Sequence, residues 1–287
     1  MPDEKYCYPN SNVLINKLGI RDFDKLQEAE RKITRVKIAK ISDKPVKGDF
    51  NLKHLQSIHK AIFSDIYDWA GKNRTVDIAK SNLFCRAQFL DSYSQDIFSQ
   101  LKRDKYLIGM DKDRAIAKLA EYMGDINALH PFREGNGRSQ RQFITYLAEA
   151  AGIQIDFTKV DSDRMMEASL KSFVTDYSGF KEIFEKIAEP ISLEIQEKFL
   201  KNISPEAYKT FEGLKLQGLL PDREAEFNNG DAGQLLSEDG VEHNQSRKPQ
   251  GESMDDWKAK IAKEKAENPI KNRSDGNLRM RSGKTDR

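Results

Sequence analysis

The chain has 287 residues, of which 33% are charged, and its formal net charge is only +2. That balance excludes proteins that bind nucleic acid or anionic membranes through a large charge excess, and no apolar run is long enough to span a membrane. The N-terminus lacks a secretory signal and the two cysteines fit no metal-ligand spacing, so we expect a protein of the reducing cytoplasm.

Apolar residues recur at helical spacing through most of the first two hundred residues. Side chains that often cap helix N-termini precede several of these stretches, and a glycine suited to a helix C-terminus follows one of them. We therefore expect helices after Asp22, from Asn51, after Asp111 or Asp113, from Gly137 to just before Gly152, over residues 163–174, and over residues 178–201 with a bend at Pro190.

The segment "RTVDIAKSNLFCRAQFL", which begins at Arg74, interrupts the helical pattern. Polarity alternates from Thr75 to Ile78, three polar turn residues follow, and apolar residues resume at Leu83 and Phe84. This pattern predicts a short β-hairpin, which must pack against helices because isolated hairpins are marginally stable in water.

Composition changes near Pro221. We expect residues 1–190 to form one domain, residues 191–220 a helical extension, and residues 221–287 a polar, disordered region that the fold does not need. A short helix is expected from Ser253. The last seventeen residues hold six Lys or Arg and two Asp. This basic end is either a solvated tail or a recognition signal.

The string "HPFREGNGRSQR" starts at His130 and lies between two predicted helices. Gly135, Asn136 and Gly137 give the backbone the freedom to point successive N–H groups at an anion, and the helix dipole adds positive potential there. Arg138 and Arg141 are three residues apart and therefore share a helix face. Two guanidinium groups suit two phosphoryl groups, so the string predicts a polyphosphate site.

Glu134 and His130 add chemistry to this site. A carboxylate beside bound phosphates commonly holds Mg²⁺, and a histidine can act as a general base near neutral pH. The set predicts nucleotidyl or phosphoryl transfer, although a solvated polar loop could have a similar composition. No Walker A loop is present. His54 and His59 are five residues apart and do not share a helical metal face, so we expect both to be ordinary surface or packing histidines.

The same string matches the motif H-P-F-x-[D/E]-G-N-G-R-x-x-R of the Fic (filamentation induced by cAMP) domain family at every specified position. Upstream, "IFSDIYDWAGKNRTVDI" resembles the segment that leads into the Fic flap hairpin. The resemblance covers roughly residues 10–190. The chain looks most like bacterial Fic AMP-transferase toxins that a separate small antitoxin restrains.

The resemblance implies a mainly α Fic-type bundle with a small β-hairpin flap. It also implies transfer of AMP from ATP to a Ser, Thr or Tyr hydroxyl of a target protein, with release of pyrophosphate. By position in the motif, the implied roles are base for His130, Mg²⁺ ligand for Glu134, α- and β-phosphate support for Gly135, Asn136 and Gly137, β-phosphate contact for Arg138, and γ-phosphate contact for Arg141. The implied target-docking flap residues are Asp77, Ile78, Ala79, Lys80 and Phe84.

The sequence also bears on how the implied activity is inhibited and on which other functions stay open. Many Fic proteins carry an inhibitory [ST]-x-x-x-E-[GN] helix, but none of the three glutamates that precede Gly or Asn has Ser or Thr four residues before it. We therefore expect a separate antitoxin that places a glutamate beside Arg141. The alternatives are transfer of another nucleotide or phosphocholine, a non-catalytic binding protein, and an effector delivered by type IV secretion. We expect no membrane and no direct nucleic-acid partner.

Overall fold

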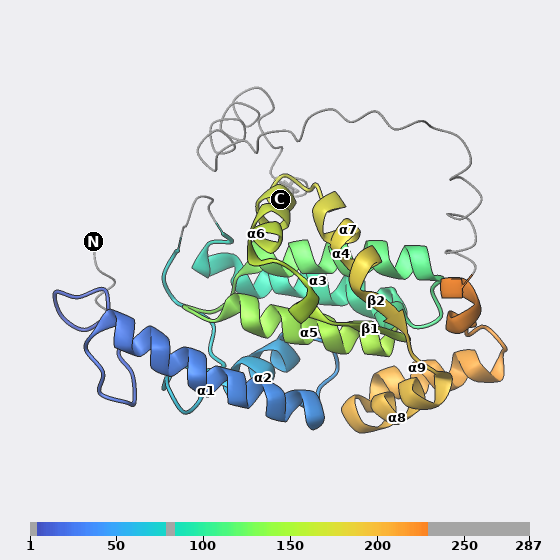
Figure 1. Ribbon diagram of the computed structural model, residues 1–287, viewed down its shortest axis with the longest axis horizontal. Coiled ribbons are helices and arrows are strands. Elements are labelled where there is room, and N and C mark those ends of the chain that lie inside the picture. The colour runs from blue at the N-terminus through green and yellow to red at the C-terminus, as the bar shows by residue number, and fades with distance from the viewer. Residues whose placement is uncertain (1–4, 79–83, 229–287) are drawn as a thin grey trace, which may run out of the picture. The chain divides into compact units, whose positions relative to one another are not determined.

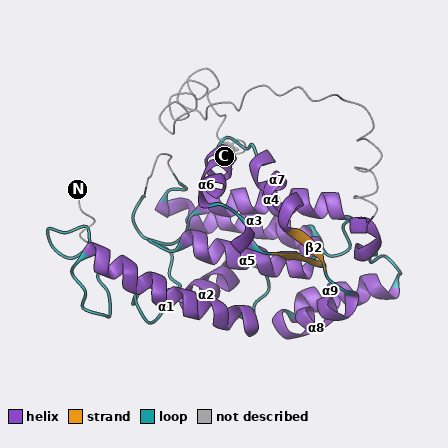
Figure 2. Ribbon diagram, in the orientation of Figure 1, coloured by secondary structure: helices purple, strands orange, loops and turns teal. Residues whose placement is uncertain are grey.

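The computed structural model describes residues 5–78 and 84–228, and helices dominate this part of the chain (Figures 1 and 2). The mainly α fold expected from the sequence is confirmed. The helices are α1 (Phe23–Asp43), α2 (Leu52–Phe63), α3 (Leu90–Arg103), α4 (Lys112–Leu129), α5 (Asn136–Ala150), α6 (Ser162–Ser172), α7 (Ser178–Ile187), α8 (Leu193–Ile203) and α9 (Pro205–Leu216), with single 3-10 turns at Ala87–Phe89, Lys105–Leu107 and Phe157–Lys159.

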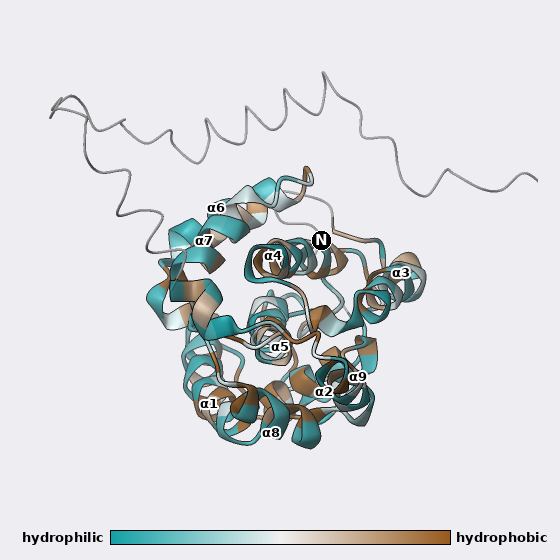
Figure 3. Ribbon diagram, turned by 90° about the vertical axis from the view of Figure 1, so that its right-hand side faces the viewer, coloured by the Kyte–Doolittle hydropathy of each residue, from teal (hydrophilic) through white to brown (hydrophobic). Residues whose placement is uncertain are grey.

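Helix α5 lies in the middle of the bundle, with the other helices arranged around it when the molecule is viewed along its length (Figure 3). Its apolar side chains are fully buried, among them Phe143, Ile144 and Leu147. Helices α2, α4 and α8 all pack against it. Because the backbone groups inside a helix bond to one another, only the two ends of α5 can present unpaired backbone groups to other partners.

The predicted helix starts are confirmed where a side chain caps the first turn. Asp22 accepts a hydrogen bond from the backbone N–H of Lys25, and Asn51 accepts one from that of His54. Of the two aspartates proposed for α4, Asp111 is the cap and accepts from the N–H of Arg114 at 2.9 Å. Each cap satisfies one of the donors that a helix N-terminus leaves unpaired.

The single helix predicted over residues 178–201 is wrong. It is divided into α7 and α8 by strand β2 (Ala188–Pro190), which pairs antiparallel with β1 (Ile153–Ile155) and places Pro190 opposite Ile153. A proline has no N–H to continue a helix, and Ser192 caps a new one by accepting from the N–H of Ile195. Helix α3 was not among the expected elements, whereas α9 lies within the helical extension expected over residues 191–220.

The hairpin expected around residues 75–84 is not formed by the described residues on either side of it, and residues 79–83 lie outside the description. Neither 75–78 nor 84–86 is a strand. Side chains satisfy the backbone groups that a strand ladder would pair. The Arg74 guanidinium donates to the carbonyls of Val76 and Cys85, and the Asp77 carboxylate accepts from the N–H of Ala87. Within the described residues, the two-stranded sheet is β1–β2 instead.

The expected boundary at residue 221 falls inside the ordered fold. Residues 223–228 are helical, and Arg223 is buried with only 4% of its surface exposed. Its guanidinium donates to the carbonyls of Ala151 and Met110 and pairs with Glu226. The segment is polar, but one buried arginine ties it to the core. Residues 229–287, including the helix expected from Ser253, lie outside the description.

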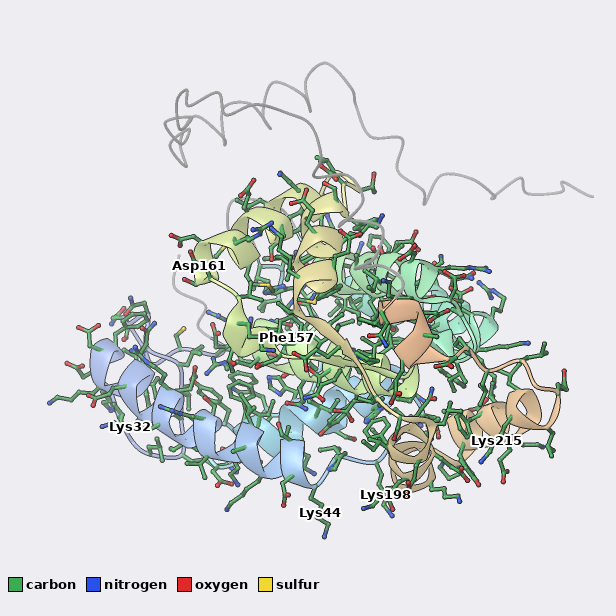
Figure 4. The ribbon with its side chains drawn as sticks, turned by 45° about the vertical axis from the view of Figure 1, so that its right-hand side comes forward. Lys32, Lys44, Phe157, Asp161, Lys198 and Lys215 are labelled. Atoms are coloured by element: carbon green, nitrogen blue, oxygen red, sulfur yellow. The ribbon has the colours of Figure 1, made fainter. Side chains whose placement is uncertain are left out.

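No helix among the described residues is long and apolar enough to cross a membrane. Charged side chains cover the outer faces of the bundle. Lys32 on α1, Lys44 just after α1, Lys198 on α8 and Lys215 on α9 all extend outward from the ribbon (Figure 4).

Candidate active site

His130 ends helix α4 in a left-handed conformation, with φ 43° and ψ 60°. Its backbone N–H donates to the carbonyl of Ile126 at 3.1 Å, and its ring Nδ1 lies 3.3 Å from the carbonyl oxygen of Asn127. Because a carbonyl can only accept, this contact places the proton of a neutral ring on Nδ1 and leaves Nε2 as the basic nitrogen. The ring of Phe84 stacks on the imidazole with centroids 3.6 Å apart.

Asn136 closes the loop between α4 and α5. Its side-chain oxygen accepts from the N–H of Phe132 at 2.8 Å, and its side-chain nitrogen donates to the carbonyl of Phe132 at 2.7 Å. Both residues are buried. The Asn136 amide is therefore occupied within the loop, which differs from the phosphate contact that the motif match implies for it. What Asn136 offers an anion is its backbone N–H at the start of α5.

The first turn of α5 has no side-chain cap. Gly135 precedes it with φ 81°, a conformation that favours glycine, and a β-carbon there would collide with the ring of Phe63. Glycine thus allows the backbone to enter the helix close beside α2. The uncapped N–H groups and the helix dipole make this end of α5 electropositive, as an anion site requires.

His59 on α2 holds the loop before α5 by a hydrogen bond to its backbone. Its Nδ1 accepts from the N–H of Gly71 at 2.9 Å, so its Nε2 carries the proton and donates to the carbonyl of Glu134, also at 2.9 Å. Burial lowers the pKa of His59 to about 4, which keeps the ring neutral and consistent with this tautomer. The expected packing role is thus accompanied by a hydrogen bond to the site. The carboxylate of Glu134 accepts from the N–H of Gly135 at 2.9 Å and remains 40% exposed.

Arg138 already has a carboxylate partner. Its Nη2 lies 2.5 Å from an oxygen of Glu30 on α1, its Nη1 donates to the hydroxyl of Thr34, and its guanidinium lies over the ring of Phe63. The other oxygen of Glu30 accepts from the hydroxyl of Tyr67. Glu30 lies 108 residues from Arg138, and the sequence pattern did not indicate it.

Arg138, Glu30 and Tyr67 line a cavity of about 360 Å³. Its lining brings the start of α1 and the loop before it together with the loop that precedes α5. The lining residues are Asn12, Leu14, Phe23, Leu26, Gln27, Glu30, Arg31, Tyr67, Glu134 and Arg138.

Arg141 contrasts with Arg138. Within residues 5–78 and 84–228, no carboxylate or other acceptor is bonded to the Arg141 guanidinium. Burial, and then the charge of Arg138, lower its pKa from the usual value for arginine. A mostly buried cation with no acceptor among its described neighbours is costly unless an anion joins it, so Arg141 supports a site for an anionic ligand.

The expected flap residues are only partly described. Asp77 accepts from the N–H of Ala87, Ile78 is half-buried, and Phe84 packs between His130 and Phe173. Ala79 and Lys80 lie outside the described residues. The structure thus brings one flap residue, Phe84, into direct contact with the histidine of the site.

Comparison with known proteins agrees with this geometry. The model of the Fic/DOC family matches residues 49–148, which span α2 to most of α5. The protein adenylyltransferase VbhT of Bartonella schoenbuchensis is 40% identical over 172 residues, covering 60% of this chain but only 36% of VbhT. The probable protein adenylyltransferase Fic of Escherichia coli K12 is 33% identical over 186 residues, covering 64% of this chain and 92% of that protein.

Solved structures match as well. The ADP-bound N-terminal Fic domain of a VirB-translocated effector from Bartonella quintana superimposes with a TM-score of 0.62 and 27% identity. The match covers 68% of this chain and 99% of that domain.

Proposed function

The chain belongs to the Fic/DOC family, and on that premise we propose that it is a protein adenylyltransferase, which transfers AMP from ATP to a hydroxyl side chain of a target protein. The observation that carries the proposal is the N-terminal end of α5. Its first turn is uncapped, Arg141 has no acceptor among the described residues, and His130 ends the preceding helix. An anion-binding helix end with a base beside it suits attack by a hydroxyl at a phosphate.

In the proposed reaction, His130 removes the proton of the target hydroxyl. Nε2 is the atom that takes the proton, because Nδ1 faces the carbonyl of Asn127. The hydroxyl oxygen forms a bond to the α-phosphorus, the bond from that phosphorus to the bridging oxygen of the β-phosphate breaks, and pyrophosphate leaves. The proton stays on His130 until it exchanges with solvent.

The phosphates are held by the start of α5. In the proposed complex the N–H groups of Asn136 and Gly137 bind the α- and β-phosphates, and the N–H of Gly135 joins them once the Glu134 carboxylate, which accepts from it in this structure, releases it. Arg138 contacts the β-phosphate, and Arg141 contacts the γ-phosphate. Charge-assisted bonds of this kind stabilise the negative charge that develops on the leaving pyrophosphate. The role of the Asn136 side chain is to hold the loop shape through Phe132.

The residues present fit a Mg²⁺ ion that arrives with the nucleotide. No group of three or more His, Cys, Asp or Glu side chains among the described residues could hold a metal alone. Glu134 offers one exposed carboxylate beside the anion site, and Mg²⁺ often binds one or two carboxylates with phosphate oxygens and waters as its other ligands. Bound there, the ion would neutralise phosphate charge.

We further propose that the flap stem, residues 75–78 and 84–86, aligns the target segment by main-chain hydrogen bonds. In this proposal Asp77, Ile78, Ala79, Lys80 and Phe84 pair with an extended segment of the target beside His130. The support is that the ring of Phe84 stacks on the His130 imidazole. Main-chain pairing of this kind provides affinity with little demand on sequence.

Restraint by a separate small antitoxin is part of the proposal. An inhibitory glutamate placed beside Arg141 would occupy the γ-phosphate position. The support is that Arg141 has no carboxylate partner in the described part of the chain and that the inhibitory motif is absent from the full sequence. Action in the bacterial cytoplasm and delivery through type IV secretion both remain compatible with the matched relatives.

The test uses ATP labelled at the α- or the γ-phosphorus, incubated with the protein and a bacterial lysate. Adenylyl transfer attaches the α-label to an acceptor protein and leaves the γ-label in pyrophosphate. Attachment of the γ-label alone would identify a kinase instead. Attachment of neither, with ATP binding intact, would favour a non-catalytic binding protein, provided that lysates from several hosts have been tried.

A further inference from the structure

Arg74 lies outside the twelve-residue motif, yet its side chain reaches the middle of the site. It is one of the largest fully buried side chains, with 2% of its surface exposed. Its guanidinium donates to three backbone carbonyls that come from three segments of the chain, those of His130, Val76 and Cys85. The guanidinium also pairs with the carboxylate of Asp77 at 4.0 Å. A buried guanidinium that binds carbonyls of three segments fixes the relative position of those segments.

The first of these bonds holds the histidine. Nε of Arg74 donates to the carbonyl of His130 at 2.8 Å, and the backbone N–H of Arg74 donates to the carbonyl of Pro131 at 2.8 Å. His130 has a left-handed conformation that non-glycine residues rarely adopt. Such a conformation persists only when its surroundings enforce it. Two consecutive carbonyls held by one residue provide that enforcement.

The other two bonds hold both sides of the flap stem. Nη1 donates to the carbonyl of Val76 at 2.8 Å, and Nη2 donates to the carbonyl of Cys85. The N–H of Cys85 donates to the carbonyl of Ala128, two residues before His130. Cys85 is thereby fixed from two directions, and its neighbour Phe84 stacks on the His130 ring.

We propose that Arg74 is a positioning residue that couples the flap stem to the catalytic base, setting both the backbone of His130 and the Phe84 ring that packs against its imidazole. This role deepens the proposed adenylyl transfer and rests on it. Lysine cannot replace arginine in full, because one ammonium group cannot reach three carbonyls in the planar arrangement of a guanidinium.

Arg223 offers a matched control. It is also a buried arginine, 4% exposed, and it donates to the backbone carbonyls of Ala151 and Met110 at the other end of α5. Arg74→Gln and Arg223→Gln therefore remove similar bonds, and both should lower the melting temperature. Only the first should alter catalysis.

The kinetic experiment measures transfer from α-labelled ATP into lysate acceptors and, separately, ATP affinity by calorimetry, both below the melting temperature of each variant. We expect Arg74→Gln to lower kcat by about 10²-fold, the typical effect of a displaced catalytic group, with ATP affinity unchanged. Arg223→Gln should keep the wild-type kcat. Equal kcat for the two variants would overturn the proposal. If Arg74→Gln fails to fold, Arg74→Lys takes its place, and a wild-type kcat for that variant would overturn it equally.

A second readout does not depend on activity. The stacked ring of Phe84 should move the ring-proton signals of His130 upfield in the NMR spectrum, and His130→Ala identifies those signals by their loss. We expect them to move toward their ordinary position in Arg74→Gln and in Phe84→Leu, and to stay in place in Arg223→Gln. Unmoved signals in Arg74→Gln would refute the coupling. Absence of transfer by the wild-type protein would refute the proposed function and leave this test intact.

Discussion

The two ends of helix α5 differ in how their backbone groups are satisfied. At the C-terminal end, Gln196 donates to the carbonyl of Ala150 at 2.7 Å, Arg223 donates to that of Ala151, and the N–H of Ile191 donates to that of Gly152. At the N-terminal end, no side chain caps the first turn and Arg141 has no acceptor among the described residues.

This difference suggests that the C-terminal end of α5 serves stability and its N-terminal end serves ligand binding. Groups that are fully paired within the protein stabilise it and offer nothing to a ligand. Buried polar or charged groups that are left without a partner reduce stability, and they are retained where a ligand completes them. Changes at the N-terminal end should therefore affect catalysis and nucleotide binding, and changes at the C-terminal end should affect stability.

The largest effect is expected from His130→Ala. Loss of a general base typically lowers the rate by about 10²–10⁴-fold. ATP affinity should stay near the wild-type value, because in the proposed mechanism the ring contacts the incoming hydroxyl and not the triphosphate. Turnover with labelled ATP and calorimetric titration with ATP measure the two quantities. Turnover that survives the substitution would remove His130 from the role of base.

Two truncations test the contribution of the C-terminal end of α5 to stability. A chain that ends at Leu220 loses Arg223 and leaves the carbonyls of Ala151 and Met110 without its guanidinium, and each buried group left unpaired costs about 1–3 kcal/mol. We expect the free energy of unfolding in urea to fall by about 2–5 kcal/mol. A chain that ends at Asn228 keeps Arg223 and should match the full chain. Equal stability of the two truncations would show that Arg223 contributes little.

The two arginines of the N-terminal end should respond differently. Arg138→Ala and Arg141→Ala should each weaken ATP binding by about 1.5–3 kcal/mol, the usual contribution of a charge-assisted bond. Arg138→Ala should also destabilise the fold, because it leaves Glu30 buried without its cation, whereas Arg141→Ala should not. Calorimetry and urea unfolding check both effects. Unchanged ATP affinity in both variants would refute the phosphate assignments.

Glu149, near the C-terminal end of α5, should make stability depend on pH. Burial raises its pKa from 4.5 to about 7, so the folded protein favours its protonated form. The stability that this provides is present below pH 4.5 and is lost as pH rises through about 7, by about 2–3 kcal/mol at most. Glu149→Gln should remove this loss, while the effects of His54 and His59, whose pKa values burial lowers to about 4, stay common to both proteins. Parallel stability profiles of the two proteins would contradict the assignment.

The smallest effect is expected at Glu30. If Arg138 binds the β-phosphate as proposed, the Glu30 carboxylate competes with the phosphate for it. Glu30→Gln should then raise ATP affinity by about fivefold, roughly the value of one partly exposed ion pair. Glutamine keeps hydrogen bonds to Tyr67 and Arg138, which limits structural damage. Weaker ATP binding in this variant would show that Glu30 instead orients Arg138 toward the nucleotide.

Local patterns predicted well what depends on neighbouring residues. The caps at Asp22, Asn51 and Asp111 were correct because a cap bonds within its own helix turn. The motif string predicted which groups gather between α4 and α5 for the same reason: these groups lie within twelve residues.

Partners distant in sequence could not be predicted in this way. Glu30 meets Arg138 across 108 positions, and Arg74 meets His130 across 56. Arg74 and His59 also bind backbone carbonyls, which every residue has, so no pairing of side-chain types could reveal them. The internal role of the Asn136 amide likewise depends on the loop shape that it helps to make.

The central claim is that the N-terminal end of α5 transfers AMP. The most direct measurement is mass spectrometry of an acceptor protein isolated after incubation with ATP and either the wild-type chain or His130→Ala. The account predicts a mass increase of one adenylyl group on a Ser, Thr or Tyr side chain with the wild-type chain and none with the variant. A phosphoryl or phosphocholine adduct, or equal modification by both proteins, would contradict it.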